Sequence, residues 1–219
     1  MLDAWVLVPV TKDLAVPREY EPADLVWLDE LGIPTLKDAR MRLRIQAAAA
    51  LAEMFDAARE QGHTLVVCSA YRSYADQVAT FDQWVADEMA KAESAGSPIS
   101  REEAERRANQ FSALPGHSEH QLGTTVDVSS PEVAFDLVAG FADAPPGRWL
   151  AGNSYRFGYV FSYPGGKEKL TGYIAEPWHL RWIGRTHASE LQRLGYLDPS
   201  TLVTLASYLL ELRAPTEKP

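Results

Sequence analysis

The sequence predicts a single α+β domain with a small, mostly antiparallel sheet and surrounding helices. The chain has 219 residues, of which 46% are hydrophobic and 23% charged, as is typical of one globular domain with a sizeable core. Helix and strand patterns occur without the regular alternation that builds parallel sheets. No internal repeat or linker interrupts the chain. The domain is therefore expected to span residues 1–219, with its core motifs at about 64–184 and a last helix at about 199–213.

The charge balance argues against two classes of partner. The formal net charge is -9 at pH 7, whereas a general nucleic-acid binder usually presents a basic face. The same negative charge argues against an anionic membrane surface. No stretch approaches the roughly 20 apolar residues that a transmembrane helix needs. The single cysteine, Cys68, lies in an apolar run and is expected to be a buried core thiol rather than a nucleophile.

Local composition predicts the elements of the first half of the chain. The alanine-rich stretch 47–52 favours a long helix, and Gly62 stands where that helix is expected to end. Ser100 and Glu103 match a capping box, in which each side chain satisfies a free backbone N–H of the other residue. In chain order we expect a strand at 6–10, a helix at 36–60, a strand at 64–69, a helix at 74–91 and a helix that starts at Ser100.

Glycine and proline residues separate the predicted helices and strands of the second half of the chain. Gly158 and Gly195 stand just past two predicted helices, and the Pro-Gly-Gly segment at 164–166 predicts a turn. Leucines recur at helical spacing near the end of the chain. We expect a strand at 124–128, a helix at 148–155, a strand at 159–163, a helix at 183–194 and a last helix that starts at Asp198 and Pro199.

A polar segment between residues 115 and 127 contains the first candidate metal ligands. Gly116 and Gly123 bracket a tight stretch that leads into the predicted strand. His120 precedes the second glycine and Asp127 lies within the strand, so the two side chains can converge if the chain turns between them. Imidazole and carboxylate groups both bind zinc, at roughly 2.0–2.2 Å. A catalytic zinc takes three protein ligands and one water, so this segment would supply two of the three.

The segment from Glu176 to Arg181 would supply the third ligand, His179. Glu176 stands three residues earlier, where its carboxylate could accept the proton of a zinc-activated water and pass it to a leaving amine. In a helix, positions i and i+3 share a face, whereas a regular strand points them to opposite faces. The sequence leaves the choice between helix and strand open, and Pro177 would mark an edge or a bulge of a strand.

These motifs together resemble one family of zinc peptidases. The pattern Ser118-x-His120-x-x-Gly123-x-x-x-Asp127 is followed, about fifty residues later, by Glu176-Pro177-Trp178-His179. The segment Ser69–Ser73, with Gln77 four residues on, also matches in the same order. The set resembles the VanY-like D-alanyl-D-alanine carboxypeptidases, which belong with D-Ala-D-Ala dipeptidases and L,D-carboxypeptidases. The matching motifs span roughly residues 69–181, about half of the chain.

The resemblance implies a role for each residue of the motifs. It implies that one zinc ion per chain is bound in a cleft by His120, Asp127 and His179, and that Glu176 is the general base. It also implies that Arg72 faces the substrate, which suits the fixed fork of donors of a guanidinium group. The further substrate contacts that it implies are Ser118, Gln77 and Tyr71.

The other histidines are expected to stay outside the metal site. His117 could pair with His120 as an alternative set of ligands, but the resemblance implies that the position of His117 does not bind the metal. His63 and His187 are expected at the surface. Two positions depart from the family pattern, because Ser162 stands where a basic residue is usual and Leu180 where an aromatic residue is usual. Neither position belongs to the expected metal site, and both bear on substrate preference.

The resemblance implies a zinc carboxypeptidase that removes the C-terminal D-alanine of peptidoglycan stem peptides by attack of a metal-bound water. The sequence does not separate D,D- from L,D-specificity. An endolysin-like peptidoglycan endopeptidase, a non-catalytic zinc-containing cell-wall binding module and a cytoplasmic interaction domain with structural histidines remain alternatives. Cell-wall substrates lie outside the cytoplasmic membrane, so we expect the protein to act there. The sequence starts without the basic segment and apolar run of a signal peptide. We expect that an export segment has been trimmed from it, with a leaderless or phage-encoded protein as the alternative.

Overall fold

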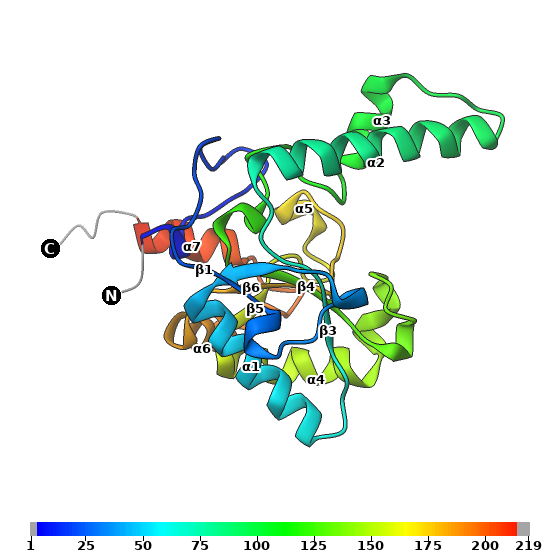
Figure 1. Ribbon diagram of the computed structural model, residues 1–219. Helices are drawn as coiled ribbons and strands as arrows, with labels where there is room; N and C mark the ends of the chain where they lie inside the picture. The colour runs from blue at the N-terminus through cyan, green and yellow to red at the C-terminus, as the bar shows by residue number, and fades with distance from the viewer. Residues whose placement is uncertain (1–3, 214–219) are drawn as a thin grey trace, which may run out of the picture.

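A four-stranded antiparallel sheet lies at the centre of the fold (Figure 1). The computed structural model describes residues 4–213. The strand order is β3-β4-β6-β5, and each neighbouring pair is antiparallel. A second, two-stranded sheet pairs β1 with β2. The strands are β1 Leu25–Trp27, β2 Arg42–Arg44, β3 Val66–Ser69, β4 Thr125–Ser129, β5 Tyr159–Phe161 and β6 His179–Trp182.

Helices surround the sheet and complete the α+β domain that the sequence predicts. The helices are α1 Ile45–Glu60, α2 Tyr74–Ser94, α3 Arg101–Ala108, α4 Pro145–Asn153, α5 Glu168–Thr171, α6 Arg185–Arg193 and α7 Leu205–Arg213. Short 3-10 turns occur at η1 Ala4–Leu7, η2 Asp29–Leu31, η3 Leu36–Asp38, η4 Glu119–Leu122, η5 Pro131–Val133, η6 Ala139–Asp143 and η7 Ser154–Phe157. Within residues 4–213, no helix is long and apolar enough to cross a bilayer.

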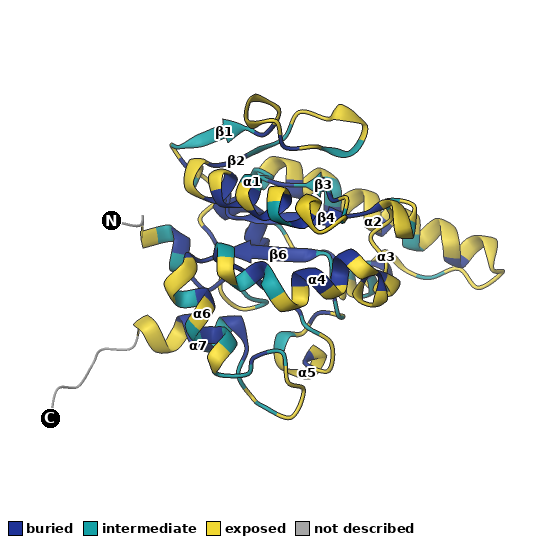
Figure 2. Cartoon of the chain, turned by 90° about the horizontal axis from the view of Figure 1, so that it is seen from below, coloured by how far each residue is buried: buried dark blue, intermediate teal, exposed yellow. Residues whose placement is uncertain are grey.

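The two faces of the central sheet differ in chemistry. Successive side chains of a strand point to opposite faces. On β4, Val126 and Val128 therefore share the face that packs into the main core with α1, α4 and α6, and on β6 Leu180 does the same. Asp127 and His179 take the opposite face. Figure 2 shows β6 buried along its length, with exposed residues on the outer sides of these helices. Since both faces are covered, the polar face is also shielded from water.

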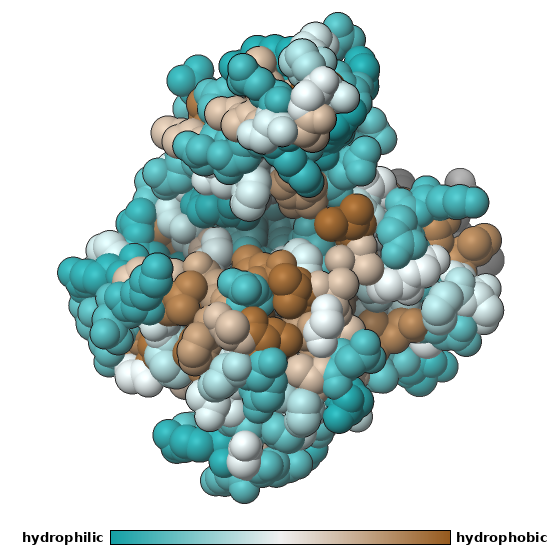
Figure 3. Space-filling model, turned by 90° about the vertical axis from the view of Figure 1, so that its right-hand side faces the viewer, coloured by the Kyte–Doolittle hydropathy of each residue, from teal (hydrophilic) through white to brown (hydrophobic). Residues whose placement is uncertain are grey.

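The helices α2 and α3 project from the body as an antiparallel pair (Figure 1). The pair has a small apolar cluster of its own, formed by Phe81, Val85, Ala104 and Ala108. Ser73 forms a complete capping box with Asp76 at the start of α2. The space-filling view from this side shows a hollow beneath the pair, with apolar side chains gathered below it (Figure 3).

The predicted capping box at Ser100 is only half formed. The Ser100 hydroxyl accepts the backbone N–H of Glu103, as predicted. The Glu103 carboxylate does not return to the backbone of Ser100, because it pairs with Arg106 and Arg107 on its own helix. Ion pairs at spacings of three and four residues compete with the cap for this side chain.

Two predicted elements at the beginning of the chain are wrong. Residues 6–10 do not form a strand, since Ala4–Leu7 is a 3-10 turn and the carbonyls of Val6 and Val8 accept hydrogen bonds from Arg181 of β6 rather than from a neighbouring strand. The helix predicted at 36–60 begins only at Ile45. Lys37 and Asp38 have positive φ angles of 55° and 53°, which a helix cannot contain, and the next residues pair with β1.

The last helix starts later than predicted, at Leu205 rather than at residue 198 or 199. The buried ammonium group of Lys167 binds the carbonyls of Thr201 and Val203 and so holds them outside any helix. Leu202, one of the leucines at helical spacing near the end of the chain, precedes this helix and is 79% exposed. The other predicted strands and helices are present with shifted ends, and residues 1–3, which bear on the prediction about export, lie outside the described part.

Candidate metal centre and active site

A tight turn brings the side chain of His120 to the polar face of the sheet, beside Asp127. His120 lies in η4, and Gly123 ends that turn in the left-handed conformation, with φ 67°. The left-handed conformation favours glycine at this position, and a Cβ would also lie 2.9 Å from Leu25 Cδ2. His120 Nδ1 lies 2.7 Å from the carbonyl oxygen of Ala70 and therefore carries the proton. The Nε2 lone pair is left facing Asp127 Oδ2 at 3.2 Å.

Strand register places the other two candidate ligands. Asp127 and His179 are directly paired residues of β4 and β6. Their side chains leave the sheet on the same face, with His179 Nδ1 3.2 Å from Asp127 Oδ1. One donor atom from each of His120, Asp127 and His179 lies within 4.8 Å of the other two.

The donor set fits a metal ion on evidence from this structure. His120 Nε2 and Asp127 Oδ1 are buried without a hydrogen-bond partner, and such atoms are rare in folded proteins. Burial, reinforced by the charge of Arg72, lowers the pKa of His120 to about 4, so its imidazole is neutral. Two imidazoles and one carboxylate form a typical catalytic zinc set with an open fourth position.

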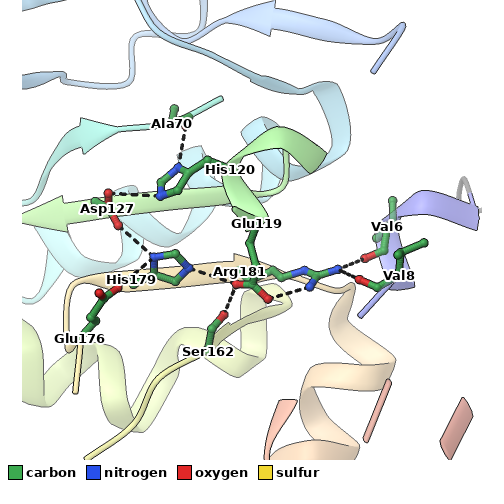
Figure 4. A network of polar contacts seen from close by, with 10 residues as sticks. All are labelled: Val6, Val8, Ala70, Glu119, His120, Asp127, Ser162, Glu176, His179 and Arg181. Carbon is green, nitrogen blue, oxygen red and sulfur yellow. Dashed lines mark hydrogen bonds and ion pairs between the residues drawn. The ribbon is translucent and has the colours of Figure 1, made fainter. Parts of the chain in front are cut away.

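Glu119 binds the ring nitrogen of His179 that faces away from Asp127, and the sequence analysis missed this residue. His179 Nε2–H donates to Glu119 Oε2 over 3.0 Å, which leaves Nδ1 facing the other ligands. Arg181 Nη1 donates to Glu119 Oε1 over 2.7 Å, and the Ser162 hydroxyl also donates to this carboxylate (Figure 4). Burial alone would raise the pKa of Glu119, but Arg181 and His179 lower it to about 2. The only sequence signal for Glu119 was its position beside a ligand.

Ser162 therefore takes part in the surroundings of the metal centre, although the sequence analysis placed it apart. It does not contact a ligand directly, but its hydroxyl helps to hold the carboxylate that binds His179. Leu180, the other departure from the family pattern, is fully buried in the main core. Its side chain faces away from His179 and Asp127, since neighbouring residues of a strand point to opposite faces.

Glu176 lies in a turn, which answers the question of helix or strand. The backbone N–H of His179 donates to the Glu176 carbonyl over 3.2 Å, and β6 begins only at His179. The turn brings Glu176 Oε2 to 3.4 Å from His179 Nδ1. Burial raises the pKa of Glu176 to about 7, although the charge of His179 acts in the other direction. A carboxyl group with this pKa can both accept and donate a proton near neutral pH.

The guanidinium group of Arg72 lies near Asp127 and Glu176. Arg72 follows β3, and its backbone N–H donates to the carbonyl of His120. Among the described residues, none forms a hydrogen bond with its guanidinium, and Nε is buried without a partner. Burial lowers the pKa of Arg72, while the charges of Asp127 and Glu176 oppose that effect. The group is thus available to an anion.

The remaining predicted substrate contacts occupy different surroundings. Gln77 is 1% exposed and its Nε2 donates to the carbonyl of Ala113 over 2.7 Å, while its Oε1 is buried without a partner. Ser118 is buried at the start of η4 and its side chain makes no capping bond there. The ring of Tyr71 lies 5.1 Å from the guanidinium of Arg42, and its hydroxyl is buried without a partner.

The other histidines lie outside the metal group, in line with the sequence analysis. His117 Nδ1 is 2.8 Å from the carbonyl of Thr11, and His187 Nδ1 is 3.0 Å from the Tyr208 hydroxyl. Cys68 is half-buried rather than fully buried as predicted. Burial, with the charge of Asp127, raises the pKa of Cys68 to about 11, which is unsuitable for a nucleophile.

A pocket of about 410 Å³ adjoins this centre and reaches Glu119 and Ser162. Tyr163 and Tyr173 line it, and their ring centroids are 4.7 Å apart. The Tyr163 ring also lies 4.8 Å from that of His179. Lys12 Nζ stands 3.5 Å above the Tyr173 ring, and burial lowers its pKa to about 8 against the opposing charge of Glu176. Residues 10–13 thus form one wall of the pocket beside the site.

Comparison with known proteins identifies the family. The sequence profile of VanY, D-alanyl-D-alanine carboxypeptidase, matches residues 40–185. The chain belongs to the VanY family. YodJ of Bacillus subtilis is 38% identical over 187 residues, which cover 85% of this chain and 63% of YodJ. A D-alanyl-D-alanine carboxypeptidase of Enterococcus faecalis is 32% identical over 191 residues, with 87% and 63% coverage. The chain thus matches about 63% of the length of both curated relatives.

Solved structures share the fold over nearly the whole chain. The LD-carboxypeptidase LdcB, studied for its peptidoglycan recognition, is 35% identical, with 94% of this chain and 86% of LdcB covered at a TM-score of 0.77. A VanY D,D-pentapeptidase from a VanB-type resistance cassette, solved with Zn(II), is 31% identical, with 94% and 99% covered at a TM-score of 0.72. These VanY-family neighbours are peptidases, and zinc is the metal that fits His120, Asp127 and His179.

Proposed function

We propose that this VanY-family chain is a zinc-dependent carboxypeptidase that removes the C-terminal D-alanine from peptidoglycan stem peptides. The observation that carries the proposal is the arrangement around the metal group. The buried carboxyl group of Glu176 lies 3.4 Å from His179 Nδ1, and the guanidinium of Arg72, which has no hydrogen bond within residues 4–213, lies on the same side near Asp127 and Glu176. A site that only bound metal would have no use for either group.

Each residue has a distinct task in the proposed reaction. Zinc held at this site would supply a Lewis acid that polarises the substrate carbonyl and acidifies water. Glu176 would take the proton of the attacking water and deliver it to the departing amine of D-alanine. Arg72 would pair with the terminal carboxylate of the stem or with the negative charge that develops on the scissile carbonyl. Arg72 follows β3 and Glu176 precedes β6, so both side chains start from backbone that adjoins paired strands and need little reorganisation.

The bond that is cut defines the finer specificity. The structural neighbours include an LD-carboxypeptidase and a D,D-pentapeptidase at similar TM-scores, so likeness of fold does not separate the two. Both reactions release one D-alanine, and both would use a cation to bind the C-terminal carboxylate of the uncleaved stem. We propose peptidoglycan stems as the substrate class for either specificity, and therefore action outside the cytoplasmic membrane.

Mass spectrometry of muropeptides tests the proposal directly. The zinc-loaded protein is incubated with pentapeptide and tetrapeptide stems in one mixture, next to the Glu176→Gln variant. Loss of one alanine from the pentapeptide alone indicates D,D-specificity, and loss from the tetrapeptide alone indicates L,D-specificity. Cleavage inside the stem would replace the proposal by an endopeptidase. Two intact stems with one zinc bound per chain would replace it by a non-catalytic cell-wall binding module.

A further inference from the structure

We propose that Glu119, Ser162 and Arg181 are positioning residues of the metal centre, and that the N-terminal segment 4–8 completes this centre by holding Arg181. The proposal concerns zinc binding and does not depend on which stem peptide is cleaved. None of these residues is a candidate ligand, and each acts through His179.

A continuous chain of contacts leads from the metal group to the N-terminal segment (Figure 4). His179 Nε2 binds Glu119 Oε2 at 3.0 Å, and Arg181 Nη1 binds Glu119 Oε1 at 2.7 Å. Arg181 Nη2 then donates to the carbonyl oxygens of Val8 at 2.6 Å and Val6 at 3.0 Å. A hydrogen bond of this kind to a ligating histidine fixes the orientation of its ring and the choice of its coordinating nitrogen.

The burial of the ion pair between Glu119 and Arg181 indicates that the pair orients His179 rather than stabilises the fold. Glu119 is 3% exposed and Arg181 is fully buried. A buried ion pair gains little net stability over a well-packed apolar pair, because both charges lose their hydration. Here the pair stands directly behind a metal ligand, and every hydrogen bond of the Glu119 carboxylate goes to His179, Ser162 or Arg181. Replacement by apolar side chains would fill the space but would leave the His179 ring free to turn.

The N-terminal segment joins the centre from outside the matched family region. The VanY profile begins at residue 40, whereas Val6 and Val8 supply the acceptors for Arg181. The Val6 side chain is buried in the main core, which anchors the segment where its carbonyls can receive the guanidinium. Without these acceptors, Arg181 would keep one charged partner and lose two hydrogen bonds in a region that excludes water.

Zinc affinity of the full chain tests the proposal independently of turnover. We would measure the zinc dissociation constant by competition with a chromophoric chelator for the wild type, Glu119→Gln, Ser162→Ala and Arg181→Met. We expect Glu119→Gln and Arg181→Met to weaken zinc binding by about 10- to 100-fold, the usual effect of losing such a partner. Ser162→Ala, which removes one of several bonds to Glu119, should weaken it by less than about 10-fold.

A matched control separates positioning from general destabilisation. Lys167 is also a fully buried cation that binds the carbonyls of a chain segment, Thr201 and Val203, but it has no contact with the metal group. Lys167→Met should lower the melting temperature and leave the zinc dissociation constant unchanged. The double variant Glu119→Gln/Arg181→Met removes both buried charges, so it should fold better than Arg181→Met and still bind zinc weakly.

Hydrogen exchange provides a second measurement at the other end of the chain of contacts. By linkage, zinc binding should slow amide exchange in residues 4–8 of the wild type, and this effect should disappear in Arg181→Met or Glu119→Gln, which break the path of contacts to Val6 and Val8. Unchanged zinc affinity in folded Glu119→Gln and Ser162→Ala would overturn the role of these residues. Equal exchange in residues 4–8 with and without zinc would overturn the role of the segment.

Discussion

The substitution Glu176→Gln tests the proposed base while keeping the size of the side chain. Glu176 is 5% exposed, and its carboxylate contacts the metal group through His179 at 3.4 Å. The neutral amide cannot accept the proton of the attacking water. General acid–base catalysis contributes about 10²- to 10⁴-fold, so kcat should fall by that factor, equivalent to about 3–5 kcal/mol. Glu176 is not one of the three candidate ligands, so zinc should remain bound one to one.

The same substitution should stabilise the metal-free protein, with a characteristic pH dependence. Burial raises the pKa of Glu176 from 4.5 to about 7, so the folded state favours the protonated carboxyl. Below pH 4.5 the group is neutral in both states and has no effect, whereas between pH 4.5 and 7 the wild type loses stability as the unfolded state ionises. At pH 7 this loss reaches about 3 kcal/mol, which Glu176→Gln would recover as a rise of about 6–12 °C in melting temperature.

Two assays follow these effects together. Release of D-alanine from a muropeptide gives kcat with saturating zinc, and thermal unfolding at pH 4 and pH 7 gives the stability of the metal-free protein. Glu190→Gln, which changes an exposed carboxylate paired with Arg193 on α6, is the matched control and should alter neither. A fall in kcat of less than 10-fold, or a loss of bound zinc in Glu176→Gln, would refute the assignment of the base. A variant no more stable than the wild type at pH 7 would refute the account of the buried charge.

Three further predictions concern other parts of the site. Arg72→Lys should lower kcat/KM by about 10- to 100-fold with zinc still bound, because an ammonium group cannot reproduce the bidentate geometry of a guanidinium; equal rates on stems with and without a free C-terminal carboxylate would argue against this role. Removal of zinc by a chelator should abolish turnover and lower the melting temperature, and added zinc should restore both. At a free zinc concentration 1,000 times the dissociation constant, bound zinc should stabilise the fold by about 4 kcal/mol. Cys68, with its pKa raised to about 11 by burial, should resist alkylation by iodoacetamide at pH 8 in the native protein and react rapidly after denaturation.

The sequence was sufficient for the parts of the site that depend on residue type and order. The candidate ligands could be selected because histidine and aspartate have the right chemistry and because their motifs match a known pattern. Glu119 was missed because its importance comes from the direction of its side chain, which only the three-dimensional contact with His179 establishes. The role of Glu176 became clear only with the turn before β6.

The errors in the fold have a common physical origin, which is that tertiary contacts override local preference. Residues 6–10 are rich in valine, but a strand requires a neighbour, and the carbonyls of this segment are bound by Arg181 instead. Helix-forming residues precede Ile45, yet pairing with β1 prevents the helix from starting earlier. Lys167 similarly delays the last helix through contacts that no local pattern reveals.

The direct pairing of Asp127 with His179 has a consequence for how this protein can change over time. A one-residue slip between β4 and β6 would send one of these side chains to the opposite side of the sheet, so insertions within either strand are incompatible with metal binding. The connection between them, residues 130–178, can change in length in its loops, but it must keep β5, Ser162 and Glu176 in place. Lineages can therefore vary those loops while Asp127 and His179 stay paired on one face of the sheet.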